Sequence, residues 1–236
     1  LARLAGTAVA IGGLARLSGL SMWPAASLTL ALQPMSSLAV LLAADTFGWS
    51  SQLPGTHTPT IQALLGRGFR VVAVDQLGFG KSSKPEHFQF SFQEMATETR
   101  ALLDALHVDK VVLVGHSMGG MLATRFTLMY PDRVAKLALI NPIGLEDWKR
   151  LVPYHTVEQN YKSEQEASRD SLKRYMQENY FNGTWNKDYD RLLEPLVGWQ
   201  NGPHKNRVAW DNALTSDMIF TQPVLYELPQ LRAPTL

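Results

Sequence analysis

The sequence predicts an α/β fold with a mostly parallel sheet, flanking helices and a helical cap over one edge of the sheet. Three observations predict it. Apolar runs rich in β-branched residues alternate with amphipathic stretches between residues 38 and 140, which is the pattern of βαβ units. A Gly-x-Ser-x-Gly motif joins one such run to a helix-forming stretch at residues 115–119. From residue 148 onward the strand pattern gives way to helical patterning.

The boundaries of the expected elements follow from short apolar runs and from the residues that open helices. Thr58 and Pro59 suit an N-cap and a first helical position, and Ser91 with Glu94 forms a capping box. The order of the elements implies right-handed crossovers and parallel pairing. The predicted strands are 38–44, 69–74, 110–114 and 134–140, and the predicted helices run from 58 to 66 or 68, from 91 to about 106 and from 118 to 130.

Ser117 is the candidate nucleophile, because its surroundings are those of a strained strand-to-helix turn. Val111-Val112-Leu113-Val114 precedes the motif as a buried strand, and a helix-forming stretch follows it. The flanking glycines keep side chains out of the crowded turn, so the hydroxyl is held at the carboxyl edge of the sheet. The backbone N–H of Met118, at the start of the following helix, can then donate to a developing oxyanion.

The chain divides into four segments by these patterns. The first contains no Asp or Glu, and residues 4–15 match the apolar core of a signal peptide, so it is either an export signal or sequence foreign to the fold. The sequence is therefore compatible with either an exported or a cytoplasmic protein. The cap holds twelve of the 22 aromatic residues, which either shape an apolar pocket or fill the cap's own core. The segments are 1–44 (atypical), 45–145 (α/β core), 146–228 (helical cap) and 229–236 (return to the core).

Composition excludes several kinds of chemistry. A net charge of +1 over 236 residues gives no support for a nucleic-acid partner or an acidic membrane surface. The chain has no cysteine, which excludes disulfides, thiolate catalysis and cysteine-ligated zinc. Its six histidines are dispersed and none has a partner at i+4, so neither a metal site nor a cofactor is expected. The apolar amino-terminal run is too short for a membrane span.

Several ordered motifs make the chain resemble the α/β-hydrolase superfamily, and within it the capped serine hydrolases. The resemblance covers about residues 59 to 236 and implies that Ser117 is the nucleophile and Met118 N–H one oxyanion donor. It also implies a catalytic acid and a histidine in later loops, which are expected beyond Leu236, with the last strands and helix of the fold missing. The matching stretches are Val71–Asp75, Gly78–Pro85, Gly115–Gly120, Tyr130–Val134 and Leu137–Pro142.

Two features depart from the family's pattern. The His-Gly pair that usually supplies a second oxyanion donor is absent, and Phe47-Gly48-Trp49-Ser50 stands in that neighbourhood. Among the chain's own histidines, His155 and His204 in the cap could approach the pocket, but a solvated or capping role explains each more simply. Glu146 or Asp147 is a candidate acid, with a charge at a helix N-terminus as the simpler explanation.

We therefore expect a serine hydrolase that cleaves an apolar ester of a small molecule through an acyl-serine, with this chain by itself nearly inactive because it lacks the base. The alternative is a non-catalytic member of the same fold that binds a ligand or a partner, which the missing histidine and His-Gly pair also fit. The strained serine turn favours the enzyme, since such strain has little purpose in a scaffold. The substrate and the oligomeric state do not follow from the sequence.

Overall fold

The computed structural model describes residues 28–30, 38–43, 58–80, 82–88 and 90–236, and it confirms the α/β fold class. One sheet has the strand order β1-β3-β2-β4-β5. Strands β3, β2, β4 and β5 pair in parallel, and β1 pairs antiparallel with β3 at the edge. The strands are β1 (Leu28–Leu30), β2 (Leu38–Ala43), β3 (Arg70–Val74), β4 (Val111–His116) and β5 (Val134–Ile140).

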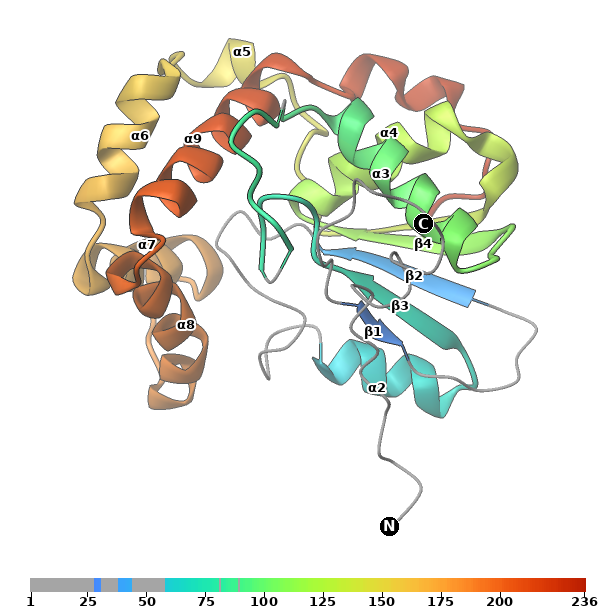
Figure 1. Ribbon diagram of the computed structural model, residues 1–236, viewed down its shortest axis with the longest axis horizontal. Helices are drawn as coiled ribbons and strands as arrows, with labels where there is room; N and C mark the ends of the chain where they lie inside the picture. Colours follow the sequence, from blue (N-terminus) through green and yellow to red (C-terminus); the bar gives the residue numbers. More distant parts are fainter. Residues whose placement is uncertain (1–27, 31–37, 44–57, 81, 89) are drawn as a thin grey trace.

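Helices cover both faces of this sheet. α2 (Thr58–Gly66) lies on one face, and α3 (Phe92–Ala105) and α4 (Met118–Met129) lie on the other (Figure 1). α3 begins where the sequence predicts, because Ser91 Oγ accepts a hydrogen bond from Glu94 N–H at 3.0 Å. Apolar side chains between α3, α4 and the sheet form the main core, and its fully buried members include Phe92, Met95, Leu103, Leu113, Leu122 and Phe126.

β2 and β3 match the predicted bounds to within one residue, and two other strands differ more. β4 ends at His116 rather than Val114, because its parallel pairing with β2 continues to the partners Ala43 and His116. β1 was not predicted, since three residues are too few to show a pattern without their partner strand.

Both β1 and β2 lie within residues 1–44, so the sheet includes part of the segment that composition set apart. The lack of charge that marked this segment also suits a central strand of a parallel sheet. The signal-like run 4–15 lies outside the described residues.

The chain after β5 is helical, as predicted, and we call the region from α5 to α9 the α5–α9 segment. It lies at the edge of the sheet toward which the parallel strands point (Figure 1). It has a small apolar core of its own around Met176, Leu193 and Leu196. Its helices are α5 (Trp148–Leu151), α6 (Val157–Glu166), α7 (Arg169–Tyr180), α8 (Asp190–Asn201) and α9 (Lys205–Thr221), and the 3-10 turns of the described chain are η1 (Pro131–Arg133), η2 (Lys187–Tyr189) and η3 (Leu225–Gln230).

Residues 234–236 return to the sheet beside β5. Thr235 forms a parallel bridge with Leu137. The N–H of Leu236 donates to the carbonyl of Leu137 at 3.0 Å, and the N–H of Leu139 donates to the carbonyl of Leu236 at 2.8 Å. β5 is therefore paired along both of its edges, with β4 on one side and with these residues on the other.

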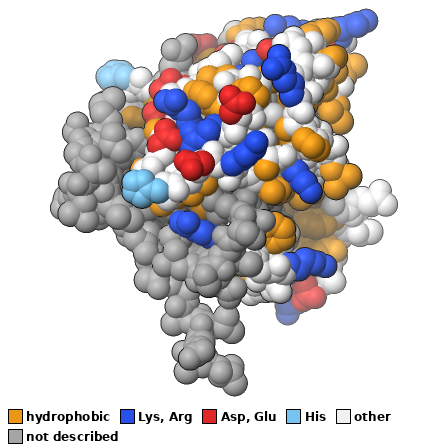
Figure 2. All heavy atoms as spheres, turned by 90° about the vertical axis from the view of Figure 1, so that its right-hand side faces the viewer, with side chains coloured by type: hydrophobic (Ala, Val, Ile, Leu, Met, Phe, Trp, Pro, Cys, Tyr) orange, Lys and Arg blue, Asp and Glu red, His pale blue; other side chains and the backbone are white. Residues whose placement is uncertain are grey.

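The surface carries charges of both signs. Figure 2 shows the face at the right-hand side of Figure 1, where basic and acidic side chains of the described residues lie interspersed. Arg133 pairs with Asp104 at 2.7 Å, and Arg100 lies 3.9 Å from the same carboxylate. Within the described part of the chain, no helix combines the length and the apolar character that crossing a membrane requires.

A buried ionic cluster ties α9 to the loop that follows β3. The Asp211 side chain on α9 is 1% exposed and pairs with Arg207 at 2.9 Å. Arg207 also donates to the carbonyl of Pro85, and Lys84 Nζ donates to the carbonyl of Gly80 at 2.9 Å. Burial raises the pKa of Asp211 from 3.8 to about 6, although the charges of Arg207 and Lys84 act in the opposite direction.

This pKa predicts a pH-dependent stability that Asp211→Asn removes. Because the pKa is higher in the folded than in the unfolded protein, protonation of Asp211 stabilises the fold. The contribution is fully present below about pH 4 and is lost as the pH rises through about 6. As the pH falls from about 7 to about 4, the free energy of unfolding of the wild type should rise relative to that of the variant, by at most on the order of 3 kcal/mol.

Denaturant titrations at several pH values measure this difference. Asp170→Asn, at an exposed position on α7, serves as the matched control and should follow the wild type. Parallel pH profiles of the wild type and Asp211→Asn would contradict the raised pKa.

Candidate active site

Ser117 occupies a sharp turn between β4 and α4. Its backbone angles are φ +51° and ψ −123°, a region that a residue with a Cβ adopts only under strain. The neighbouring chain holds this conformation. Ser117 N–H donates to the carbonyl of Ile140 at 3.2 Å, and the Ser117 carbonyl accepts from Gly120 N–H at 2.9 Å and Ile143 N–H at 3.2 Å. The turn is thus fixed both to the end of β5 and to the first turn of α4.

Two of the glycines around the turn, Gly115 and Gly120, are required by close packing. A Cβ at Gly115 would lie 2.4 Å from the carbonyl oxygen of Gly119, and a Cβ at Gly120 would lie 2.5 Å from Cβ of Pro142. Both distances are shorter than van der Waals contact. α4 can therefore start this close to the ends of β4 and β5 only because these positions carry no side chain.

Met118 directs its side chain into the core and opens α4. The side chain is fully buried, and its N–H is the first of α4, where no carbonyl within the helix can accept it. The positive end of the helix dipole adds to its attraction for a negative oxygen. The neighbouring N–H, that of Ser117, already donates to the carbonyl of Ile140 and is therefore engaged elsewhere. The sequence left the second donor unassigned, and the stretch 47–50, which stands in the neighbourhood of the family's His-Gly pair, lies outside the described residues.

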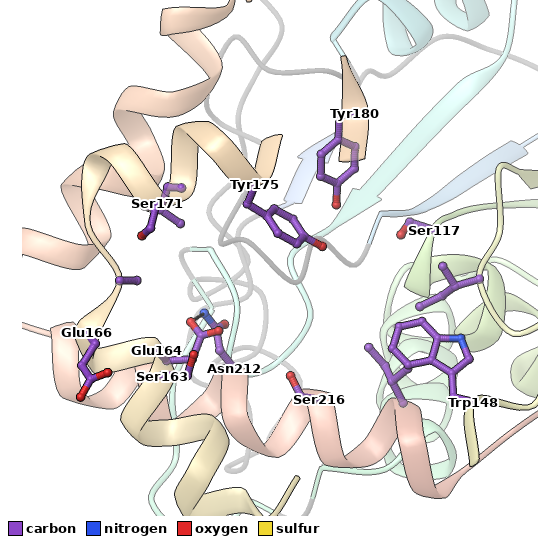
Figure 3. Close-up of a pocket in the computed structure, with 14 residues that line it drawn as sticks. Ser117, Trp148, Ser163, Glu164, Glu166, Ser171, Tyr175, Tyr180, Asn212 and Ser216 are labelled. Atoms are coloured by element: carbon purple, nitrogen blue, oxygen red, sulfur yellow. Dashed lines mark hydrogen bonds between the residues drawn. The ribbon is translucent and has the colours of Figure 1, made fainter. Parts of the chain in front are cut away.

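A cavity of about 630 Å³ lies between Ser117 and the α5–α9 segment. Figure 3 shows Ser117 and Trp148 at one end, with the rings of Tyr175 and Tyr180 reaching toward them from α7. The sheet domain contributes Ser117 and Ile143 to the wall. Among the described residues, the α5–α9 segment contributes twelve more to the lining, namely Trp148, Ser163, Glu164, Glu166, Ala167, Ser171, Leu172, Tyr175, Tyr180, Asn212, Ser216 and Ile219.

The aromatic residues of the α5–α9 segment divide between the two roles considered from the sequence. Trp148, Tyr175 and Tyr180 line the cavity. Phe181 instead stacks on Tyr189, with ring centroids 3.9 Å apart, and takes part in the packing of this segment.

The opposite end of the cavity is polar, which the sequence did not predict. Asn212 Nδ2 on α9 donates to Glu164 Oε2 on α6 at 2.9 Å. Burial raises the pKa of Glu164, and this hydrogen bond lowers it to a smaller degree. Burial also raises the pKa of Tyr175, to which the charge of Glu164 adds. No local motif marks these residues, because they meet only when α6, α7 and α9 pack.

The histidines and acids considered from the sequence lie elsewhere. His155 and His204 are exposed, and none of the described histidines lines the cavity. Asp147 caps α5 by accepting from Lys149 N–H at 3.1 Å, and its hydrogen bond from the Tyr226 hydroxyl lowers its pKa. Glu146 accepts from the indole N–H of Trp148 at 2.6 Å. In the described ranges no three His, Asp or Glu side chains gather as metal ligands would.

A parallel sheet that carries a strained serine turn in the wall of a cavity defines a class of fold. Comparison with known proteins gives the name of that class. The alpha/beta hydrolase fold family matches residues 48–192. A probable hydrolytic enzyme from Pseudomonas aeruginosa PAO1, known as a crystal structure, is 44% identical with a TM-score of 0.81, over 91% of this chain and 69% of that chain. The chain belongs to the α/β-hydrolase family.

Curated relatives match over shorter stretches. The 2-hydroxy-6-oxo-2,4-heptadienoate hydrolase of Pseudomonas putida F1 is 36% identical over 86 residues, which are 36% of this chain and 31% of that protein. The 1-acylglycerol-3-phosphate O-acyltransferase ABHD5 of Sus scrofa is 42% identical over 95 residues, covering 35% of this chain and 26% of that protein. The matched stretches thus span about a third or less of these relatives.

Gly115→Ala tests the packing at the turn. The new methyl group would collide with the backbone of α4, so we expect a loss of roughly 1–3 kcal/mol in the free energy of unfolding. Gly198→Ala is the matched control, because Gly198 is exposed within α8 and a Cβ there meets nothing within 4 Å. That variant should gain up to about 1 kcal/mol from helix propensity. Equal effects of the two substitutions, measured by denaturant unfolding, would contradict the packing argument.

Proposed function

We propose that the protein is a serine hydrolase in which Ser117 cleaves an ester or a related acyl bond of a small, largely apolar molecule. The observation that carries the proposal is the positive φ of Ser117 at the mouth of α4, in the wall of a cavity. Strain of this kind persists where function requires a side chain to be presented in one direction. Family membership and hydrolases among the relatives support the same reaction class.

The proposed reaction has two steps. Ser117 Oγ attacks the carbonyl carbon, its proton passes to a base, and the carbonyl oxygen becomes an oxyanion that Met118 N–H stabilises. The tetrahedral intermediate collapses, the alcohol leaves with a proton, and an acyl-serine remains. Water then attacks the acyl group, which releases the acid and restores the serine. We propose a histidine outside the described residues as the base, because none of the described ones lines the cavity.

The second candidate function is ligand binding without catalysis. The cavity wall favours it, because none of the described histidines lies there and a serine without a base is a poor nucleophile. The two functions differ in a measurable way, because a binding protein occupies the cavity but shows no turnover that depends on Ser117.

Ser117→Ala decides between these functions. In a form of the protein that turns over p-nitrophenyl esters, loss of the nucleophile of a serine hydrolase lowers kcat by roughly 10³-fold or more. The matched control is Ser216→Ala, at an exposed position on α9 that lines the same cavity. This control should retain kcat within about tenfold, because it removes one wall hydroxyl and no reacting group. Turnover that Ser117→Ala leaves unchanged would refute the hydrolase proposal and favour the binding protein.

A further inference from the structure

The cavity is acidic at the end that lies away from Ser117. Of the described residues that line it, Glu164 and Glu166 carry carboxylates, and none is Lys, Arg or His. Carboxylates without basic neighbours in a recessed site create a negative potential. Such a potential attracts a cation or a hydrogen-bond donor and opposes the entry of an anion.

Glu164 is the stronger of the two candidates for contact with a ligand. It is half-buried, and its hydrogen bond from the described residues comes from Asn212. A carboxylate can accept about four hydrogen bonds, so it retains capacity for a ligand. Its pKa is raised by burial, and no described basic side chain acts to offset this burial. Asp211, one position before Asn212, differs in this respect because Arg207 pairs with it.

Polar groups connect the two ends of the cavity. Figure 3 shows the hydroxyls of Tyr175 and Ser216 in the region between Ser117 and the pair formed by Glu164 and Asn212. The volume of about 630 Å³ is in the range of cavities that enclose a small organic molecule. One molecule can therefore contact both the reacting serine and the acidic end.

We propose that the acyl group cleaved at Ser117 ends in a hydrogen-bond donor, and best in an ammonium group, which Glu164 and Asn212 bind. This proposal rests on the function proposed above and assigns its substrate class. The donor hydrogen-bonds to Glu164, and the side-chain oxygen of Asn212 adds a second acceptor. A carboxylate at this end of the substrate is rejected by the charge of Glu164.

Binding of matched amides to the Ser117→Ala protein tests the proposal without any need for turnover. The probes are N-methyl amides of butanoyl, hexanoyl and octanoyl chains that end in a methyl, a hydroxymethyl, an ammonium or a carboxylate group, and calorimetry measures their affinity. At the chain length that fits, we expect the ammonium probe to bind roughly tenfold or more tightly than the carboxylate probe, with the hydroxymethyl probe between them.

The double variant Ser117→Ala/Glu164→Gln should show a ratio of ammonium-probe affinity to carboxylate-probe affinity that is roughly tenfold lower than in Ser117→Ala alone. The glutamine keeps an acceptor for Asn212, so the helix contact is retained. The matched control is Glu158→Gln, an exposed glutamate on the same helix, which changes the net charge equally and should leave the ratio unchanged.

The outcomes separate this proposal from the hydrolase proposal. Equal affinities for all four end groups, or a ratio that Glu164→Gln and Glu158→Gln lower equally, would overturn the recognition proposal even if Ser117 proves catalytic. Selective binding that depends on Glu164 would support recognition of the donor group at this end of the cavity, and a lack of ester turnover would then count against the hydrolase proposal alone.

Discussion

The close approach of α4 to the ends of β4 and β5 is the constraint on which the rest of the site depends. It holds Ser117 in a backbone conformation that costs about 1–3 kcal/mol by itself. Burial of α4 offsets that cost, since Met118, Leu122 and Phe126 are fully buried in the main core. The position of the hydroxyl and that of the first free N–H of the helix therefore follow from one packing contact.

The α5–α9 segment completes the site, and its attachment to the sheet domain is polar as well as apolar. The pairing of Asp211 with Arg207, together with the hydrogen bond from Arg207 to Pro85, fixes α9 against the loop after β3. At the other end of α9, Gln222 accepts a hydrogen bond from Phe92 N–H at 3.0 Å. With α9 fixed at both ends, the cavity wall that it carries keeps its place above Ser117.

The sequence predicted well the features that depend on neighbouring residues. The bounds of β5, the start of α4 at Met118 and the cap at Ser91 all follow from short-range patterns and were confirmed. β1 could not be predicted, because a three-residue edge strand is defined by its pairing with β3. The acidic end of the cavity was missed for a similar reason. Glu164 and Asn212 are 48 positions apart, and only the packing of α6 on α9 brings them together.

The origin of the cavity wall has a consequence for how such a protein can diverge. The α5–α9 segment packs around its own core at Met176, Leu193 and Leu196, and the residues that face the cavity are not among these. Ile219 and Leu172 line the cavity and also pack in these cores, but the serines of the cavity wall belong to neither core, so replacing one of them leaves both intact. Descendants of one ancestral gene can therefore acquire new ligand preferences by altering such polar residues of these helices, while inheriting the serine turn unchanged.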